Sequence, residues 1–483
     1  MILRYIYNDQ LAQASYLVGC AATGEALIVD PNRDIDQYID RAEREGLRIT
    51  AITETHIHAD FVSGARELAA RTGATLYLSD EGTADWKYAW AAKAGATLVY
   101  DGDTFMVGNI RIDVLHTPGH TPEHISFLLT DTAGADRPMG IFTGDFVFVG
   151  DVGRPDLLER AAGFAGTMED GARQLYRSLE RFTALPDYVQ VWPGHGAGSA
   201  CGKALGAIPS STVGYERLFN WGLNVESEQQ FVDLVLEGQP EPPRYFKEMK
   251  RINRDGAGMV ADLPEPRHLP SSALEHALAE GLVVIDTRPV TAIAGGYVPG
   301  TIAIPAGSSF LTWAGWLLPY DQPFALIADE RDITELANEL RLIGLNHLTG
   351  YWSPQVIEDW ANSHGSLNLI DQVTADELRQ RVASGQVQIL DVRGSDEYDA
   401  GHLSESINIP LGYLRERLAS IPTETPVVVH CQGGLRSAIA STILAAKGFR
   451  NVTDLIGGYA AWQRAGHPVT TESREAAGVV HAD

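Results

Sequence analysis

The sequence predicts an α/β protein of three domains, and three observations support this. The chain has 483 residues, and at about 150 residues per domain this length suggests roughly three domains. Hydrophobic residues make up 45% and charged residues 21%, which is typical of a compact globular protein and excludes a disordered or fibrous chain. Short apolar runs alternate with helix-like segments along the chain, as they do in α/β folds.

The first region, from Leu3 to about Asn253, predicts a large sheet with covering helices. Its strand-like runs are ALIVDP, ITAITETH, TLYLS, IRIDVLH, MGIFTGD and YVQVWPGH, and IDQYIDRAEREG and ARELAARTG have helical composition. Charged and aromatic segments between residues 215 and 254 indicate further helices, and the proline-rich DLPEPRHLPSS then indicates a linker. We therefore expect a first domain at residues 1–262.

The remainder of the chain contains an internal duplication. Residues of the first copy recur 105 positions later, and the matching pairs are Asp286 with Asp391, Arg288 with Arg393, Gly296 with Gly401, and Pro305 with Pro410. Each copy alternates strands with helices, which predicts a central parallel sheet with its chemistry at the carboxyl edge. We expect these two domains at residues 263–365 and 370–475.

Composition narrows the classes of partner. Lys plus Arg number 37 and Asp plus Glu number 63, a net charge of −26, and this field repels nucleic acid and anionic lipid. The three cysteines cannot form a disulfide framework, and the N-terminus has no signal-peptide pattern, so a cytoplasmic location is expected. The long uncharged stretch from Pro289 to Tyr320 is interrupted by prolines and glycines, so no membrane span is expected.

Four motifs in the first region carry imidazoles and carboxylates at the ends of predicted strands. They are HIHADF at 56–61, HTPGH at 116–120, TGD at 143–145 and PGH at 193–195. A single histidine in such a place usually caps a strand or satisfies a buried hydrogen bond, but four coincident motifs favour one metal site assembled at a sheet edge.

These motifs resemble the metallo-β-lactamase superfamily over nearly all of the first 255 residues, which implies an αββα sandwich. The superfamily pattern at the first motif is HxHxDH, and Phe61 stands here in place of the last histidine. A benzyl group cannot bind a metal ion, so a dinuclear zinc centre is disfavoured and a single ion is expected.

Within the superfamily the chain is similar to the mononuclear persulfide dioxygenases. That resemblance implies one Fe(II) per chain, held by His56, His120 and Asp145, with positions left open for sulfur and O2 and with no organic cofactor. It also implies that three further residues orient the ligands or hold water, with coordination by one of them left open. These residues are His58, Asp60 and His195.

Two nearby residues have open roles. Arg154, in GDVGRPDL, resembles the arginine of a GRxD segment in these dioxygenases; it could bind a carboxylate of a thiol carrier, or it could pair with Asp151 or Asp156 in a surface loop. Cys201 lies six residues after His195 on a glycine-rich loop, where it could handle persulfide or simply fill space. Cys20 is expected to be a packing residue.

A thiol motif marks the last domain. The apolar run VVVH leads into CQGGLRS, which starts at Cys431, and then into a helix-like segment. Backbone N–H groups and the helix N-terminus would stabilise a thiolate here. Gly433 and Gly434 would give the loop its conformational freedom, and Arg436 would add positive charge. The alternative is a structural cysteine in a buried strand.

The CxxGxR loop resembles the active loop of rhodaneses, and LDVR, EYDAGHL and NIP occur in that family's order over about residues 372–470. This likeness implies transfer of sulfane sulfur by Cys431. At the corresponding position, 103 residues earlier, the first copy has Ala328. It therefore resembles an inactive rhodanese with a scaffold or docking role.

The whole chain resembles multidomain persulfide dioxygenase–rhodanese fusions of the CstB type. This implies oxidation of a small-molecule persulfide by O2 to sulfite, followed by transfer of sulfur from Cys431 to sulfite as thiosulfate. The expected partners are therefore persulfide, O2 and sulfite, and self-association into a homo-oligomer is also expected. Two alternatives are a zinc thioester hydrolase of the hydroxyacylglutathione type with accessory rhodaneses, and a sensor protein with a structural metal.

Overall fold

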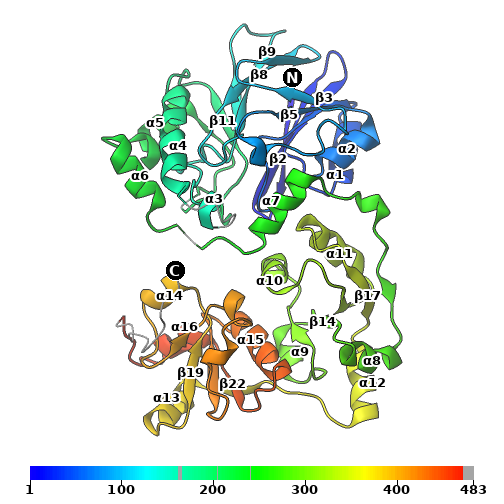
Figure 1. The fold of residues 1–483 in the computed structure, drawn as a ribbon, viewed down its shortest axis with the longest axis vertical. Coiled ribbons are helices and arrows are strands. Elements are labelled where there is room, and N and C mark those ends of the chain that lie inside the picture. Colours follow the sequence, from blue (N-terminus) through cyan, green and yellow to red (C-terminus); the bar gives the residue numbers. More distant parts are fainter. Residues whose placement is uncertain (161–165, 204, 240, 472–483) are drawn as a thin grey trace. The chain divides into compact units, whose positions relative to one another are not determined.

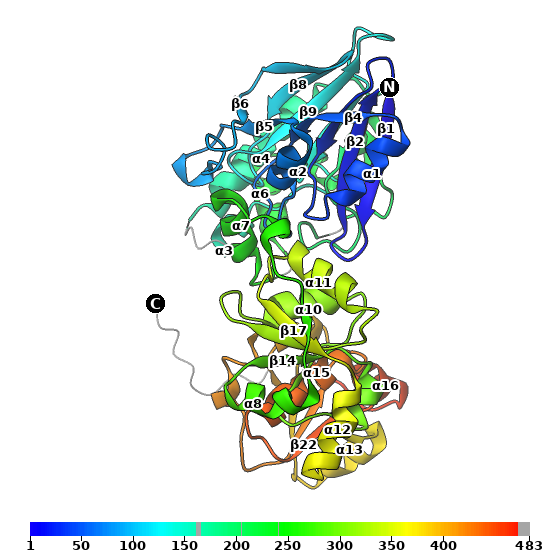
Figure 2. The same cartoon turned by 90° about the vertical axis from the view of Figure 1, so that its right-hand side faces the viewer.

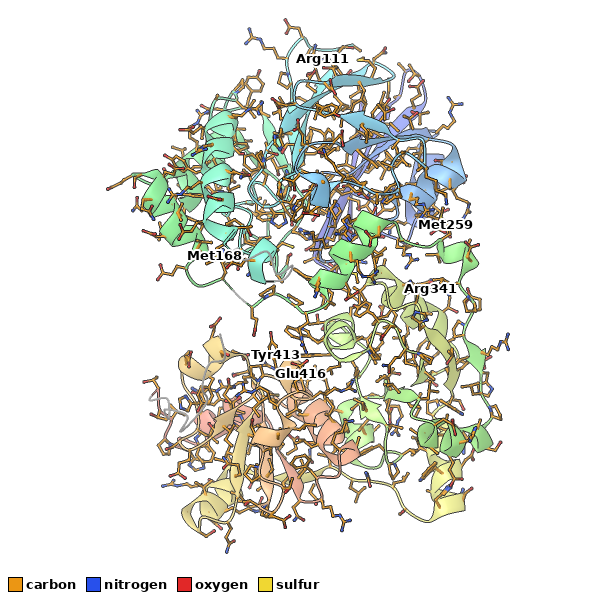
Figure 3. All side chains as sticks on the ribbon, in the orientation of Figure 1. Arg111, Met168, Met259, Arg341, Tyr413 and Glu416 are labelled. Carbon is orange, nitrogen blue, oxygen red and sulfur yellow. The ribbon has the colours of Figure 1, made fainter. Side chains whose placement is uncertain are left out.

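The computed structural model describes residues 1–160, 166–203, 205–239 and 241–471. The chain forms two compact units: residues 1–263 together with 338–346, and residues 264–337 together with the chain from 347 onward (Figure 1). Figure 3 shows side chains filling the interior of each unit. No helix in the described part of the chain has the length and apolar character that a bilayer crossing requires.

The first unit contains two six-stranded sheets. One sheet is antiparallel from β1 to β3 and parallel from β3 to β6. It consists of β1 (Ile2–Asn8), β2 (Gln13–Cys20), β3 (Glu25–Val29), β4 (Arg48–Thr53), β5 (Thr75–Ser79) and β6 (Thr97–Val99). The other, in spatial order, consists of β12 (Ser211–Thr212), β11 (Gln190–Pro193), β10 (Gly140–Gly144), β9 (Ile125–Asp131), β8 (Ile110–His116) and β7 (Thr104–Val107).

Three apolar cores separate four layers, which confirms the predicted αββα sandwich. One core lies between the two sheets, a second lies between the first sheet and its helices, and a third lies between the second sheet and its helices. Figure 2 shows the strands and helices of this unit after a turn of 90°. The first sheet is covered by α1 (Asp36–Arg44) and α2 (Ala65–Thr72). The second is covered by α4 (Met168–Thr183), α5 (Val213–Phe219) and α6 (Glu228–Leu236). The remaining helices are α3 (Leu157–Arg160), α7 (Phe246–Asp255), η1 (Ala84–Trp86), η2 (Trp221–Leu223) and η3 (Val260–Asp262).

The sequence pattern explains why α4 covers the second sheet. Leu175, Leu179 and Phe182 recur at helical spacing and are all buried in the core beneath that sheet. The opposite face of the helix carries charged residues, so burial of one stripe orients the helix. The helices predicted between residues 215 and 254 are confirmed by α5, α6 and α7.

The second unit contains two five-stranded parallel sheets with the same strand order. In spatial order the first has β13 (Arg267–His268), β17 (Leu348–Trp352), β16 (Phe324–Ile327), β14 (Val283–Asp286) and β15 (Ile302–Ala303). The second has β18 (Asp371–Val373), β22 (Val452–Leu455), β21 (Val427–His430), β19 (Gln388–Asp391) and β20 (Ile407–Asn408). The parallel sheets predicted for the duplicated region are therefore present.

Helices surround both sheets of this unit. Those of the first copy are α8 (Leu274–Ala279), α9 (Val290–Ala294), α10 (Phe310–Leu317), α11 (Ile333–Leu342), α12 (Gln355–His364) and η4 (Ser271–Ala273). The part of α11 from residue 338 onward is grouped with the first unit. Those of the second copy are α13 (Ala375–Ala383), α14 (Ser395–Asp399), α15 (Leu435–Ala446), α16 (Gly458–Arg464), η5 (Leu411–Tyr413) and η6 (Leu418–Ser420).

One part of the predicted linker is wrong. Within DLPEPRHLPSS, residues 267–268 form the edge strand β13, which pairs with Gly350 and Tyr351 of β17. A two-residue strand has no hydrophobic periodicity, so the sequence gives no sign of it. The limits predicted for the three domains, 1–262, 263–365 and 370–475, stay predictions.

Candidate functional site: a metal centre and a thiol loop

The three predicted metal ligands converge at the carboxyl ends of their strands. His56 follows β4, His120 lies between β8 and β9, and Asp145 follows β10. Asp145 Oδ2 lies 3.9 Å from His56 Nε2 and 3.6 Å from His120 Nε2, and all three side chains are buried. Within the described residues, Asp145 Oδ2 has no hydrogen-bond partner. A buried, unpaired carboxylate oxygen beside two imidazole nitrogens fits a bound cation.

Contacts of the other imidazole nitrogens help to orient the two rings. His56 Nδ1 lies 3.0 Å from Thr55 Oγ1, and His120 Nδ1 lies 3.0 Å from the carbonyl oxygen of Arg154. These contacts leave Nε2 of each ring directed toward Asp145. Burial lowers the pKa of His56 well below its usual value and also lowers that of His120. Both rings are therefore neutral, which is the form that binds metal ions.

His195 bridges two carboxylates beside this centre. Its Nδ1 lies 2.7 Å from Asp145 Oδ1 and its Nε2 lies 2.7 Å from Asp60 Oδ2. Burial alone would lower the pKa of His195, but these two carboxylates outweigh it and raise the pKa well above its usual value. Because His195 holds Oδ1 of Asp145, the other carboxylate oxygen, Oδ2, is left to bind a metal ion together with His56 and His120.

Cys201 lies next to this bridge. Its sulfur and donor atoms of Asp60 and His195 all lie within 4.8 Å of one another, and its side chain is buried. Burial, followed by the charges of Asp145 and Asp60, raises the pKa of the Cys201 thiol well above its usual value. The loop therefore brings a neutral thiol close to the metal donors, as its position in the sequence suggested.

The His58 ring packs on that of His56, with centroids 4.2 Å apart, but its Nε2 is directed to Asp30. Its Nε2 lies 3.2 Å from Asp30 Oδ1, and its ring packs on Phe61 with centroids 4.4 Å apart. Burial alone would lower the pKa of His58, but the Asp30 carboxylate raises it to about 9. Phe61 is fully buried and offers no donor atom, so a hydrophobic ring occupies the position of the missing imidazole.

Sequence reasoning missed two buried residues that support the centre. Asp30 accepts hydrogen bonds from the backbone N–H and hydroxyl of Thr55, immediately before His56. His124 Nε2 accepts a hydrogen bond from the backbone N–H of Asp145. The available signal for Asp30 was its place at the end of the strand ALIVDP, the same pattern that identified the four motifs.

Arg154 is fully buried and bound within its own loop. Its Nε and Nη2 donate to the two carboxylate oxygens of Asp156 at 2.8 and 2.7 Å, and Nη1 donates to the carbonyl oxygen of Ala200. The ion pair considered for this residue is present, but it is buried rather than on the surface. The hydrogen bond from Nη1 to Ala200 ties the Arg154 loop to the loop of Cys201. A role for Arg154 in binding substrate stays a prediction.

The second site surrounds Cys431, at the end of β21. Its sulfur accepts a hydrogen bond of 3.1 Å from the backbone N–H of Gly434, the residue that precedes α15. Gly434 has a φ of 115°, a conformation that favours glycine, whereas Gly433 does not require a positive φ. Ser437 Oγ, which sequence reasoning missed, lies 3.6 Å from the sulfur. The loop therefore presents hydrogen-bonding groups to the sulfur at the start of a helix.

Arg436 lies in the first turn of α15. Its Nη2 donates to Glu397 Oε1 at 2.8 Å, and Nη1 donates to the other oxygen of the same carboxylate. This ion pair fixes the guanidinium near the loop, and the hydrogen bonds from Arg436 lower the pKa of Glu397. Anion binding by Arg436 stays a prediction.

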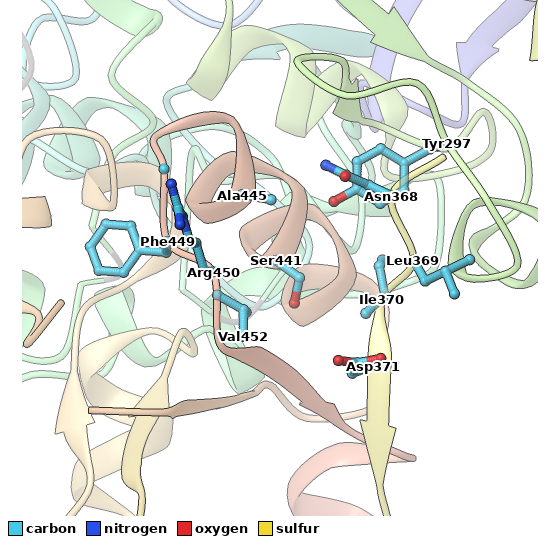
Figure 4. Close-up of a pocket in the computed structure, with 11 residues that line it drawn as sticks. Tyr297, Asn368, Leu369, Ile370, Asp371, Ser441, Ala445, Phe449, Arg450 and Val452 are labelled. Carbon is cyan, nitrogen blue, oxygen red and sulfur yellow. The ribbon is translucent and has the colours of Figure 1, made fainter. Parts of the chain in front are cut away.

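A cavity of about 400 Å³ lies elsewhere in the second unit (Figure 4). It runs between the C-terminal half of α15 and the segment that joins the two copies; its lining includes Tyr297, Asn368, Ser441 and Arg450. None of its lining residues is a predicted site residue, so the cavity does not coincide with either candidate site.

Comparisons with known proteins agree with this architecture. A family model described as the metallo-beta-lactamase superfamily matches residues 8–195, and one described as a rhodanese-like domain matches residues 374–465. A solved structure of a metallo-beta-lactamase from Staphylococcus aureus subsp. aureus COL is 45% identical, covering 73% of this chain and 99% of that chain, with a TM-score of 0.66. The chain belongs to the metallo-beta-lactamase superfamily.

Other members of the superfamily that are similar to this chain include a dioxygenase and a hydrolase. The mitochondrial persulfide dioxygenase ETHE1 of Bos taurus is 26% identical over 47% of this chain and 78% of its own length. A hydroxyacylglutathione hydrolase of Chromohalobacter salexigens is 36% identical over 36% of this chain and 58% of its own. The comparisons therefore support an enzyme of the metallo-hydrolase and rhodanese kind, and they do not distinguish an oxygenase from a hydrolase.

Proposed function

We propose that the protein is a persulfide dioxygenase coupled to a sulfurtransferase. The observation that carries this proposal is the donor set of the metal centre. His56, His120 and Asp145 converge, while Phe61 replaces the imidazole that a second ion of the two-metal hydrolases uses. Two imidazoles and one carboxylate are the set typical of mononuclear iron(II) oxygenases. An iron(II) ion held there would supply the activation of O2.

The first reaction consumes one persulfide, one O2 and one water, and gives thiol, sulfite and two protons. The terminal sulfur is oxidised from the sulfane level to sulfite, and O2 is the oxidant. In this reaction His195 and Asp60 hold water and move its protons, since His195 is hydrogen-bonded to both Asp60 and Asp145. Buried Cys201 lies beside this pair, where it contacts the incoming persulfide.

The second reaction takes place at Cys431. The thiolate attacks the outer sulfur of a second persulfide, a new S–S bond forms, and the carrier leaves as a thiolate that takes up a proton. Sulfite then attacks the outer sulfur of the cysteine persulfide, which releases thiosulfate and restores the thiolate. The N–H group of Gly434 supports the sulfur in both steps, because it donates to Cys431 Sγ.

The remaining parts of the proposal concern the partners and the first copy of the duplicated domain. We propose that the carrier is a low-molecular-weight thiol such as glutathione or coenzyme A, that the protein acts as a homo-oligomer in the cytoplasm, and that the first copy is an inactive rhodanese of a CstB-type fusion. Ala328 at its loop lacks the thiol that the transfer requires.

The decisive experiment combines metal analysis with O2 uptake. Anaerobic loading with iron should give about one iron per chain, and O2 should be consumed with glutathione persulfide or coenzyme A persulfide. Cys431→Ser should leave O2 consumption intact and abolish thiosulfate formation. No uptake with either persulfide, or two zinc ions per chain with thioester hydrolysis, would overturn the proposal.

The second candidate is a zinc thioester hydrolase, favoured by the hydroxyacylglutathione hydrolase relative. Phe61 argues against it, because the second ion of such an enzyme loses a ligand. Phe61→His offers a direct comparison: under the main proposal it increases zinc binding without increasing persulfide oxidation.

A further inference from the structure

A short segment of the first copy of the duplicated domain belongs to the first unit of the structure. Residues 338–346, which comprise the end of α11 and the loop that follows it, are grouped with residues 1–263. Within this segment Arg341, Leu342 and Ile343 are all buried. The reactions proposed above use none of these residues.

The segment contacts the loop that carries the second half of the first metal motif. The backbone N–H of Val62, two residues after Asp60, donates a hydrogen bond of 2.7 Å to the carbonyl oxygen of Leu342. Gly344 packs so closely beside this bond that a Cβ there would lie 2.8 Å from Ile252 Cδ1 and 3.3 Å from Val62 Cγ2. The segment therefore holds the loop by a backbone hydrogen bond and by apolar packing.

A buried arginine connects the same segment to the strand end that holds His58. Two hydrogen bonds of Arg33 go to the segment: its Nη1 donates to Asn346 Oδ1 at 2.8 Å and to the carbonyl oxygen of Arg341 at 3.3 Å. Three residues before Arg33, Asp30 Oδ1 lies 3.2 Å from His58 Nε2. Because a buried guanidinium is costly without acceptors, these contacts fix the chain just beyond Asp30.

The loop supplies a neighbour of the metal donors. Asp60 Oδ2 lies 2.7 Å from His195 Nε2, and His195 Nδ1 lies 2.7 Å from Asp145 Oδ1. A displacement of the loop therefore reaches the proposed ligand Asp145 through two hydrogen bonds. On its other side the loop is anchored by Asn253, which donates to the carbonyl oxygen of Phe61 at 2.7 Å. The segment of the first copy anchors the very next residue.

The second copy shows that the domain fold itself does not require this contact. Gly344 and Gly448 occupy equivalent helix ends: each donates its N–H to the carbonyl oxygen three residues earlier, at 3.1 and 3.0 Å, and their φ angles are 75° and 89°. A Cβ at Gly448 would meet nothing within 4 Å. The preceding residue is the buried Ile343 in the first copy and the exposed Lys447 in the second. The helix end is therefore common to both copies, whereas its apolar contact surface belongs to the first copy.

We propose that residues 341–346 of the first copy position the loop at residues 58–63 and, through it, the ligands of the metal centre. The Leu342 carbonyl holds the loop at Val62, and Asn346 holds the neighbouring strand end. The copy that lacks a thiol then has a function in the first unit. This role rests on metal binding at the proposed centre, but not on whether the metal supports oxygenation or hydrolysis.

Gly344→Asn tests the contact in the full-length protein. Asparagine accepts a positive φ, but its side chain does not fit against Ile252 and Val62, so the segment should move away from the loop. In metal-free protein, amide exchange in peptides covering residues 57–64, measured by mass spectrometry, should become about tenfold faster. Anaerobic affinity for iron(II), measured by competition with a chelator, should fall about tenfold. Gly448→Asn is the matched control and should change neither quantity.

A pair of variants at Asn346 provides an independent test if Gly344→Asn does not fold. Asn346→Ala removes an acceptor of the buried Arg33 and should lower the affinity for iron(II) about threefold. Asn346→Asp keeps an oxygen acceptor at the same place and should retain the affinity of the unmodified protein. A loss of metal that the conservative variant restores is specific to this hydrogen bond.

Three outcomes would overturn the proposal. They are faster exchange in the loop with unchanged affinity for iron(II), unchanged affinity in both Gly344→Asn and Asn346→Ala, and an equal loss of affinity in Gly448→Asn. If the unmodified protein bound iron(II) but consumed no O2 with persulfide, the proposed function would fail, whereas the effect of the segment on metal affinity would still be measured.

Discussion

The cost of burying Asp454 leads to a prediction about stability. The pKa of this carboxyl is about 6 in the folded protein, against an ordinary value of 3.8, because burial disfavours the ionised form. The folded state therefore holds the proton more tightly than the unfolded chain does. The resulting decrease in the free energy of unfolding is absent below pH 3.8, develops as the pH rises, and is nearly complete above pH 6. The Asp454→Asn variant cannot ionise at this position, so its stability does not carry this penalty.

The size of the effect follows from the two pKa values. A difference of about two pKa units corresponds to about 3 kcal/mol when the carboxyl is fully ionised. At pH 5 the penalty is about 1.6 kcal/mol and at pH 7.5 it is about 3 kcal/mol, so the variant's advantage should grow by about 1.4 kcal/mol between them. Other effects of the substitution on stability add a constant offset but leave this dependence on pH unchanged.

Hydrogen exchange can measure this difference in the full-length protein. Because a chain with several domains does not unfold in two states, a single melting temperature is not suitable. The slowest amides of α15 and β21, followed by mass spectrometry and corrected for intrinsic rates, report the opening free energy of this domain. Asp371→Asn, at an exposed position, serves as the control. A variant that is equally destabilised at both pH values would falsify the reasoning, because Asp454 would then be a structural acid.

Three further predictions concern the two sites. His195→Gln should weaken metal affinity 10- to 100-fold, measured by competition with a chelator, because His195 orients Asp145; unchanged affinity would exclude that role. Gly119→Ala should reduce metal content by more than half, since a Cβ there would lie 2.5 Å from Leu175 Cα and Gly119 has a φ of 143°; full occupancy would contradict this. Gly458→Ala should lower thiosulfate formation at least tenfold with normal metal content, because its Cβ would lie 2.2 Å from the carbonyl oxygen of Cys431; a loss of metal would show wider damage.

The sequence alone was sufficient for the architecture and for the principal residues of both sites. Strand-end motifs are local features, so the pattern indicated a metal site, and the family resemblance indicated His56, His120 and Asp145 as its ligands. The pattern predicted one large sheet, but the structure has two, and the three residues lie at strand ends of both sheets. The replacement by Phe61 and the thiol loop at Cys431 are likewise visible in single short segments. The internal duplication could be recognised from matching residues at a constant offset, because each copy repeats one unit of structure.

Only the tertiary structure decided how these side chains are used. His58 turns its Nε2 to Asp30 rather than to the three donors. Of the contacts open to Arg154, the structure shows the ion pair with Asp156, buried rather than on the surface. Asp454 gave no signal in the sequence, because its burial depends on the pairing of β22 with β21. Hydrogen-bond partners distant in sequence depend on loop paths and strand register, and these are set by packing of the whole domain rather than by any local pattern.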